Sequence, residues 1–255
     1  MHTAITRVPA ASLAKCELTY LDRRSIDIDR ALEQHRRYQD ALRALGLDVV
    51  TLPPDDALPD SCFVEDTALV LDEVAIMARP GVESRRGEID PMATELARHR
   101  RVERVTAPAT FDGGDILLVD RTIYVGVAKR IARTNHAGAE AIRGIAEPLG
   151  YDVRVVSFDG CLHLLSAVTE IGSGSVLLNP AWVDPSAFEP LGVVCVAETE
   201  PSGANTLRVG EKVLMPTSAP TTTARLRQLG RDIQCLDVSE FEKAEAGVTC
   251  LSLLL

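Results

Sequence analysis

A repeated outline along the chain limits its fold more than any other sequence feature. A polar segment leads into a short apolar run, a two- or three-residue break and a second apolar run, and a helical pattern with a single apolar strand follows. Short apolar runs around polar breaks predict β-hairpins, and apolar residues at helical spacing predict the helices. The first polar positions of successive units are spaced by 46, 51, 42 and 45 residues, at Asp66, Asp112, His163, Asn205 and Cys250.

The predicted elements follow this outline through the chain. Hairpin strands are expected at 67–71 and 74–78, 116–119 and 122–127, 164–171 and 175–178, and 206–209 and 212–215. Helices are expected at 27–45, 85–98, 135–149, 185–191 and 221–229, each followed by a strand, at 47–52, 102–105, 153–156, 193–196 and 233–236. A fifth hairpin would begin at Cys250 and take its second strand from residues 3–8 at the other end of the chain.

Units of this length predict a closed ring. Repeats with periods of about 20 to 50 residues are typical of arrays and propellers. Pairing of the two chain ends would close the fifth unit, and no linker interrupts the pattern. We therefore predict an α/β fold, a five-bladed pseudo-symmetric α/β propeller, formed as one domain over residues 1–255. The first polar residue of each hairpin would point into the central channel, where we expect the active site.

Composition limits the classes of partner. The net charge is −10, from 27 basic and 37 acidic residues, which opposes nucleic-acid binding and is compatible with a cationic small-molecule substrate. No apolar stretch approaches the ~18 residues of a membrane helix, so no membrane partner is expected. The N-terminal residues lack the pattern of a secretory signal. These features predict a cytoplasmic protein, either a monomer or a homodimer.

The six cysteines point to free thiols rather than to a metal site. They form no CxxC pair and match no zinc-finger spacing, and in a reducing compartment we expect them to stay unpaired. The alternative is a metal at the axis. Several hard carboxylates with one soft thiol match no common ligand set, so neither a metal nor another cofactor is expected.

Cys250 is the candidate nucleophile. It opens the apolar C-terminal run just after Gly247, and its thiol needs a partner because an ordinary cysteine with a pKa near ~8.5 is mostly protonated at neutral pH. His163 could act as the base, and Asp112 could hold the imidazole in one tautomer. The alternatives are a merely buried Cys250 and a competing nucleophile at Cys161.

Further carboxylates beside this pair favour a cationic ligand. Glu65 and Asp66 stand at the start of one predicted hairpin. A planar guanidinium suits such a pair because its N–H groups can form forked, charge-assisted hydrogen bonds to carboxylate oxygens. Asp115 could bind the guanidinium from a second side or form a purely structural pair, and the sequence leaves both alternatives open.

The chain resembles the pentein superfamily of guanidine-modifying enzymes, which are five-bladed α/β propellers, and within it the dimethylarginine dimethylaminohydrolases. The resemblance covers nearly the whole chain. It rests on the segments PDSCFVED (59–66), RPG (79–81), ESRRGE (83–88), DGGD (112–115), RTN (133–135), LHL (162–164) and GVTC (247–250). The chain has no room for the inserted helical domain of the similar arginine deiminases.

The resemblance implies a hydrolase that acts on Nω-methylated arginines. Cys250 would attack the guanidinium carbon, methylamine or dimethylamine would leave, and water would release citrulline from an S-alkylthiouronium intermediate. His163 would protonate the leaving amine and then activate the water, and Asp112 would be the third member of the triad. The alternatives are an arginine deiminase that acts on unmethylated arginine and a binder of methylarginines that performs no reaction.

The resemblance also implies the contacts of the substrate. Asp66 would hold the guanidinium, and Arg85 and Arg133 would bind the substrate carboxylate. The remaining implied contacts are the side chains of Glu65 and Asp60, which would fix the substrate or neighbouring groups, and the backbone carbonyls of Leu18 and Ala244, which would meet the substrate amine.

Overall fold

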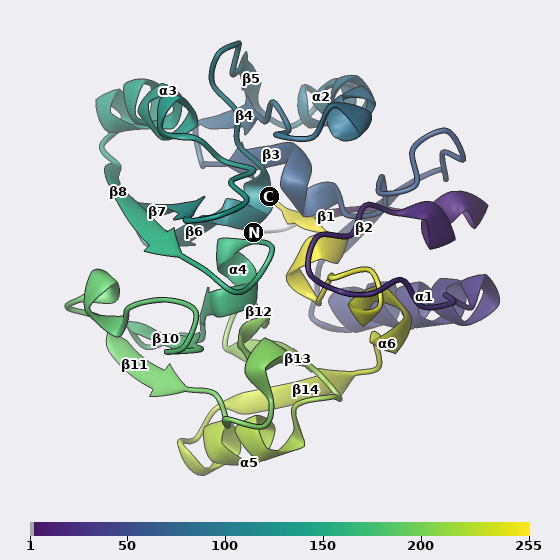
Figure 1. The fold of residues 1–255 in the computed structure, drawn as a ribbon, viewed down its shortest axis with the longest axis vertical. Coiled ribbons are helices and arrows are strands. Elements are labelled where there is room, and N and C mark those ends of the chain that lie inside the picture. Colours follow the sequence, from purple (N-terminus) through teal and green to yellow (C-terminus); the bar gives the residue numbers. More distant parts are fainter. Residues whose placement is uncertain (1–2) are drawn as a thin grey trace.

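The computed structural model describes residues 3–255 and arranges them as a ring of five three-stranded sheets (Figure 1). In each sheet two strands form an antiparallel pair, and the third strand lies parallel to the middle one. The parallel strand requires a crossover connection, and most of these crossovers are helices on the outside of the ring. The predicted five-bladed α/β propeller is confirmed.

Four blades follow one another along the chain after the first crossover. Their strands are β3 (Ala68–Val70), β4 (Val74–Met77) and β5 (Arg101–Arg104); β6 (Ile116–Val119), β7 (Thr122–Ala128) and β8 (Asp152–Phe158); β9 (Val168–Glu170), β10 (Ser175–Leu178) and β11 (Gly192–Cys195); and β12 (Leu207–Val209), β13 (Lys212–Pro216) and β14 (Asp232–Leu236).

The crossover helices are α1 (Ile28–Ala44), α2 (Ile89–Leu96), α3 (His136–Ala146) and α5 (Pro220–Gln228), and a short α6 (Ser239–Glu242) follows the last full blade. Asp27 and Asn135 cap the N-termini of α1 and α3 by accepting hydrogen bonds from backbone N–H groups. The helix predicted at 185–191 is only the 3-10 turn η6 (Pro185–Phe188). Pro190, which cannot donate a backbone hydrogen bond, and Gly192 follow that turn closely.

The two ends of the chain close the ring. The C-terminal strand β15 (Leu253–Leu254) pairs antiparallel with β1 (Thr3–Arg7), which in turn lies parallel to β2 (Asp48–Leu52). Ala4 lies opposite Leu254 and Ile5 opposite Leu253. The paired strands β1 and β15 lie near the middle of the ring (Figure 1), and the predicted pairing of the fifth hairpin is confirmed.

A helical turn precedes the first strand of each hairpin, which the sequence pattern did not predict. These turns are η2 (Val64–Thr67), η4 (Gly113–Asp115), α4 (Leu164–Ala167), η7 (Pro201–Ala204) and η8 (Thr249–Leu251). The strand predicted at 164–171 therefore begins only at Val168, and the strand after Cys250 is reduced to β15. Successive side chains rotate by roughly 100–120° in a helical turn instead of alternating, so two adjacent polar residues can both face the same site.

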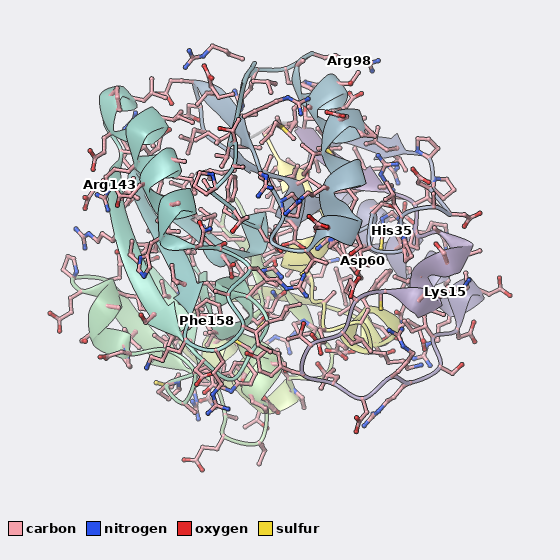
Figure 2. The ribbon with its side chains drawn as sticks, turned by 45° about the horizontal axis from the view of Figure 1, so that its top comes forward. Lys15, His35, Asp60, Arg98, Arg143 and Phe158 are labelled. Carbon is pink, nitrogen blue, oxygen red and sulfur yellow. The ribbon has the colours of Figure 1, made fainter. Side chains whose placement is uncertain are left out.

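Apolar packing fills the spaces between neighbouring blades and under the helices. Four clusters of buried apolar side chains surround the centre, and one of them joins Ile5 to Leu253 across the closure. Charged side chains such as Arg98 and Arg143 lie on the periphery, whereas Asp60 lies nearer the centre (Figure 2). Within residues 3–255 no helix is long and apolar enough to cross a membrane. Most charged side chains lie at the periphery, so the few that are buried near the centre indicate a candidate site.

Candidate active site

A chain of buried hydrogen bonds fixes the turn that carries Cys250. The Thr249 hydroxyl donates to Glu65 Oε2 at 2.6 Å and accepts from Asn205 Nδ2 at 3.0 Å. Asn205 Oδ1 accepts from the Thr249 backbone N–H at 3.1 Å, and its Nδ2 also donates to the Leu165 carbonyl. A Cβ on Gly247 would lie 2.2 Å from Asn205 Oδ1, so the chain passes too close for any other residue. Three other blades thus determine where the Cys250 turn lies.

His163 lies among three buried carboxylates. Its Nδ1 is 3.5 Å from Asp115 Oδ1 and 3.7 Å from Asp66 Oδ1, and its Nε2 is 4.0 Å from Asp112 Oδ2. A Cβ on Gly114 would lie 2.8 Å from His163 Nδ1 and 2.6 Å from Asp66 Oδ1. Gly114 also donates its backbone N–H to that Asp66 oxygen. Because Gly114 has no side chain, the His163 imidazole and the Asp66 carboxylate can both pack directly against its backbone.

The surrounding charges determine the protonation of this group. Burial by itself would lower the pKa of His163, but the carboxylates of Asp66, Asp115 and Asp112 outweigh it and raise the pKa to about 9. Burial would raise the pKa of Asp66, but His163 and Arg85 lower it overall. At neutral pH the site therefore holds an imidazolium against ionised Asp66. A protonated histidine can donate a proton to a leaving group.

Asp115 lies closer to His163 than the predicted partner Asp112. Asp115 also accepts hydrogen bonds from the Leu164 N–H at 3.1 Å and from the Thr134 hydroxyl at 2.6 Å, so its carboxylate is firmly oriented. Asp112 Oδ1 instead accepts the Gly81 N–H at 3.0 Å, while its Oδ2, within the part of the chain described, lacks a hydrogen-bond partner. Asp115 thus lies nearer to Nδ1 and Asp112 lies on the side of Nε2, and the orienting role of Asp112 stays a prediction.

The Cys250 thiol lies in a negatively charged environment. It is partly exposed, and the Gly247 N–H donates to its sulfur at 3.5 Å. Burial, followed by the carboxylates of Glu65 and Asp66, raises the pKa of the thiol well above its ordinary value. Burial and Asp66 also raise the pKa of Glu65 to about 8, although the hydrogen bond from Thr249 opposes this. Without a cationic ligand, the sulfur is therefore a protonated thiol.

Arg85 is an internal ion-pair residue in this structure. Its Nε and Nη2 form a fork with Glu88 at 3.0 and 2.8 Å, and its Nη1 lies 2.5 Å from Asp66 Oδ2. Nη2 also donates to the carbonyls of Asp60 and Phe63. The side chain is buried and these acceptors use nearly all its N–H groups. Arg85 thus orients Asp66, and its contact with a substrate carboxylate stays a prediction.

The other predicted contacts meet at the loop 17–25, an irregular segment between the first 3-10 turn and α1. The carboxylate of Asp60 accepts the Glu17 N–H at 3.1 Å, and Arg133 Nη2 donates to the Thr19 hydroxyl at 3.0 Å. Leu18 lies between these two contacts and is partly buried, and Ala244, two residues after α6, is buried. The structure therefore brings Asp60, Arg133 and Leu18 to a common loop.

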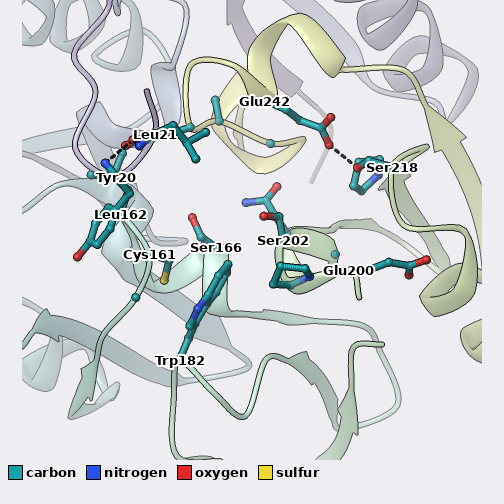
Figure 3. Close-up of a pocket in the computed structure, with 18 of the residues that line it drawn as sticks. Tyr20, Leu21, Cys161, Leu162, Ser166, Trp182, Glu200, Ser202, Ser218 and Glu242 are labelled. Carbon is teal, nitrogen blue, oxygen red and sulfur yellow. Dashed lines mark hydrogen bonds between the residues drawn. The ribbon is translucent and has the colours of Figure 1, made fainter. Parts of the chain in front are cut away.

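A cavity of about 470 Å³ opens beside the Cys250 turn (Figure 3). Gly247 and Asn205 line it together with the aromatic rings of Tyr20 and Trp182, but His163 and Asp66 do not. Cys161 lies on the wall of this cavity, and its sulfur donates to the His163 carbonyl. Burial raises the pKa of Cys161 far above the ordinary value. Among the described residues, no three His, Cys, Asp or Glu side chains are grouped to hold a metal ion.

Two residues of the site were missed from the sequence. Glu88 pairs with Arg85 three positions earlier, a spacing at which opposite charges meet on a helical turn and which could have revealed it. Glu245 binds the loop 17–25 from more than 200 positions away along the chain, and no local pattern announces such a contact.

Comparison with known proteins shows the family. The family model described as N,N dimethylarginine dimethylhydrolase, eukaryotic, matches residues 18–172. The N(G),N(G)-dimethylarginine dimethylaminohydrolase of Streptomyces coelicolor is 42% identical over 255 residues, which covers 99% of this chain and 96% of the relative. The enzyme of the same name from Pseudomonas aeruginosa is 37% identical and is covered over 97% of its length.

Solved structures agree with this family. A Cys→Ser mutant of the Pseudomonas aeruginosa enzyme in complex with citrulline superposes with a TM-score of 0.94 at 36% identity, covering 99% of this chain and 98% of the other. The N-terminal domain of a cyanobacterial arginine dihydrolase has a TM-score of 0.87 at 19% identity, a likeness of fold alone. The chain is thus a member of the dimethylarginine dimethylaminohydrolase family, within the pentein superfamily.

Proposed function

We propose that this protein hydrolyses Nω-methylated arginines to citrulline and methylamine or dimethylamine. The observation that carries the proposal is the buried group of Cys250, His163 and the carboxylates around them, in a chain 42% identical to a dimethylarginine dimethylaminohydrolase over its whole length. The five blades would act together as one catalytic domain, because each contributes to the hydrogen bonds around this group.

The charges support activation of the thiol by the substrate itself. A guanidinium placed between Glu65 and Asp66 would offset the negative charge of Asp66 and would lower the pKa of the Cys250 thiol by its own positive charge. The thiol would then release its proton to solvent more readily, and the thiolate would attack the guanidinium carbon. Binding of a cation and formation of the nucleophile are thereby linked in one step.

His163 would carry the protons. As the sulfur–carbon bond forms and the bond from carbon to the methylated nitrogen breaks, the imidazolium gives its proton to the departing amine. The neutral imidazole then takes a proton from water, which attacks the S-alkylthiouronium carbon and releases citrulline and the thiol. General acid-base assistance of this kind is worth ~10²- to 10⁴-fold. Asp112, on the side of Nε2, would be the triad carboxylate that orients the ring, and Asp115, near Nδ1, would help to stabilise the imidazolium.

The remaining contacts would bind the amino-acid part of the substrate. Arg133 keeps N–H groups for a carboxylate beyond its bond to Thr19. The carbonyls of Leu18 and Ala244 would accept hydrogen bonds from the α-amine, and Asp60 would support the loop 17–25. Arg85 would bind the substrate carboxylate together with Arg133, and it would also orient the Asp66 carboxylate that meets the guanidinium.

Citrulline production tests the proposal. Purified, reduced protein is given asymmetric dimethylarginine, monomethylarginine or arginine, with Cys250→Ser and Cys161→Ser in parallel. We expect citrulline from the methylated substrates, its loss in Cys250→Ser and its retention in Cys161→Ser. Product mainly from arginine would identify a deiminase. Methylarginine binding without product would identify a binder, and loss of activity in Cys161→Ser alone would overturn the assignment of the nucleophile.

A further inference from the structure

Glu245 binds the loop 17–25 through an unusual set of contacts. Its carboxylate accepts the backbone N–H groups of three successive residues, at 3.0 Å from Thr19 and at 2.5 Å from both Tyr20 and Leu21. Asp60 and Arg133 also hold this loop, and Arg133 is in addition proposed to bind the substrate carboxylate. The Glu245 carboxylate holds the loop without a proposed role in substrate contact.

The backbone of Glu245 is held in a costly conformation. Its φ of +60° lies in the left-handed region, which glycine and asparagine adopt far more readily than glutamate. The other two non-glycine residues with positive φ, among those described, lie in hairpin turns, at Asp120 and Ser173. Glu245 instead follows α6. Strain of this kind persists where the surrounding contacts compensate for it, and it is concentrated at functional sites.

Glu245 orients both carbonyls proposed to bind the substrate amine, one through its carboxylate and the other through its own backbone N–H. The Thr19 N–H belongs to the same peptide plane as the Leu18 carbonyl, and in a trans peptide the two point in opposite directions. Binding of this N–H by Glu245 therefore fixes the direction of the Leu18 carbonyl. The Ala244 carbonyl belongs to the peptide that precedes Glu245, whose N–H donates to the Glu242 carbonyl at 3.2 Å.

We propose that Glu245 is a positioning residue that sets the Leu18 and Ala244 carbonyls relative to each other, and so makes the site selective for ligands with an α-ammonium group. This inference rests on the proposed function. Substrates with a guanidinium but no α-amine would gain little from Glu245, because they offer no donor to the two carbonyls. Tyr20 and Leu21, which the same carboxylate holds, lie on the cavity wall with Glu242 (Figure 3).

The first arm of the test is hydrogen exchange, which needs no activity. We expect the amides of Thr19, Tyr20 and Leu21 to exchange at least tenfold faster in Glu245→Gln and in Glu245→Gly than in the parent protein. Glu245→Gly tolerates the positive φ, so it loses the carboxylate without new backbone strain. The matched control is Glu242→Gln, which lies in α6, lines the same cavity and bonds the Ser218 hydroxyl instead of the loop. Unchanged exchange at these three amides would overturn the proposal.

The second arm measures binding in a Cys250→Ser background, so that no turnover intervenes. Calorimetry compares monomethylarginine with 5-(methylguanidino)pentanoate, which lacks the α-amine. We expect Glu245→Gln to weaken the binding of monomethylarginine at least tenfold and the binding of the analogue less than twofold. Glu242→Gln should change neither affinity. Equal weakening of both ligands would reduce Glu245 to a structural role. If the parent protein binds neither ligand and makes no citrulline, the proposed function fails, while hydrogen exchange still decides whether Glu245 holds the loop.

Discussion

His163 illustrates how single residues acquire their chemistry here. An isolated histidine between two leucines would be a neutral core residue, but three carboxylates raise its pKa to about 9. Asp66 lies on the turn η2, Asp115 lies on η4, and Asp112 immediately precedes η4. Burial and the carboxylates of Glu65 and Asp66 suppress ionisation of Cys250, so the free site combines a protonated acid, His163, with a nucleophile that is not yet ionised.

Neutralising either neighbouring aspartate tests which one governs His163. Because a negative charge favours the imidazolium, its removal should lower the pKa of His163, and the proton would be lost at a lower pH. We expect Asp115→Asn to lower the pKa more than Asp112→Asn, since Asp115 is at 3.5 Å and Asp112 at 4.0 Å. NMR titration of the ring in Cys250→Ser protein measures this. A larger shift in Asp112→Asn would contradict this expectation and would identify Asp112 as the dominant carboxylate.

At the scale of elements, α1 contains a second histidine with the opposite behaviour. His35 is buried against Phe241, its Nε2 has no hydrogen-bond partner among residues 3–255, and burial lowers its pKa to about 4. The ring is held neutral, in contrast to that of His163, because no carboxylate compensates for burial. The packing of α1 on α6 thus depends on an uncharged histidine.

Acid should therefore weaken the folded state through His35. The unfolded chain takes up a proton near pH 6.5 and the folded chain only near pH 4, so stability is fully present above pH 6.5 and falls as pH drops toward 4. The full loss amounts to about 3 kcal/mol. Urea unfolding at pH 7, 6 and 5 should show the parent protein losing stability relative to His35→Leu, in which this titration is absent. A constant difference across that range would contradict the assignment.

At the scale of the whole molecule, the fold depends on joining its two ends. β15 has only two residues, yet it completes the fifth blade by pairing with β1, and Leu253 packs into the cluster that contains Ile5. The Cys250 turn immediately precedes this short strand. Ring closure and placement of the nucleophile therefore depend on the same few residues.

A Leu→Ala substitution at the ring closure should lower the free energy of unfolding more than the same substitution on the surface. We expect Leu253→Ala to lower the free energy of unfolding by about 2–5 kcal/mol, as for other buried leucines. Leu229→Ala, at a side chain that is 57% exposed, should stay within about 0.5 kcal/mol. Chemical denaturation of both variants measures the difference. Equal effects would mean that the terminal strand contributes little to the ring.

The sequence by itself determined the repeat, the five blades and their closure, because hairpins, crossover helices and turn residues are specified over short distances along the chain. The residues that meet at the centre could also be predicted from the sequence, since each lies at the start of one repeat. Family resemblance added the reaction. Even so, the helical turn before each hairpin escaped prediction, because short polar segments such as Gly113–Asp115 carry no period long enough to distinguish a turn from the start of a strand.

The tertiary structure alone decided which polar groups meet. Asp112 and Asp115 are three positions apart, and only their directions on η4 place Asp115 against His163 and Asp112 against Gly81. Arg85 forms ion pairs with Glu88 and Asp66 because a buried guanidinium needs hydrogen-bond acceptors inside the protein for nearly all of its N–H groups. Glu245 reached the loop 17–25 across the closure of the ring. The sequence gives the spacing of residues along the chain. The partners of buried charges depend instead on side-chain direction and on segments that the fold brings together from different blades.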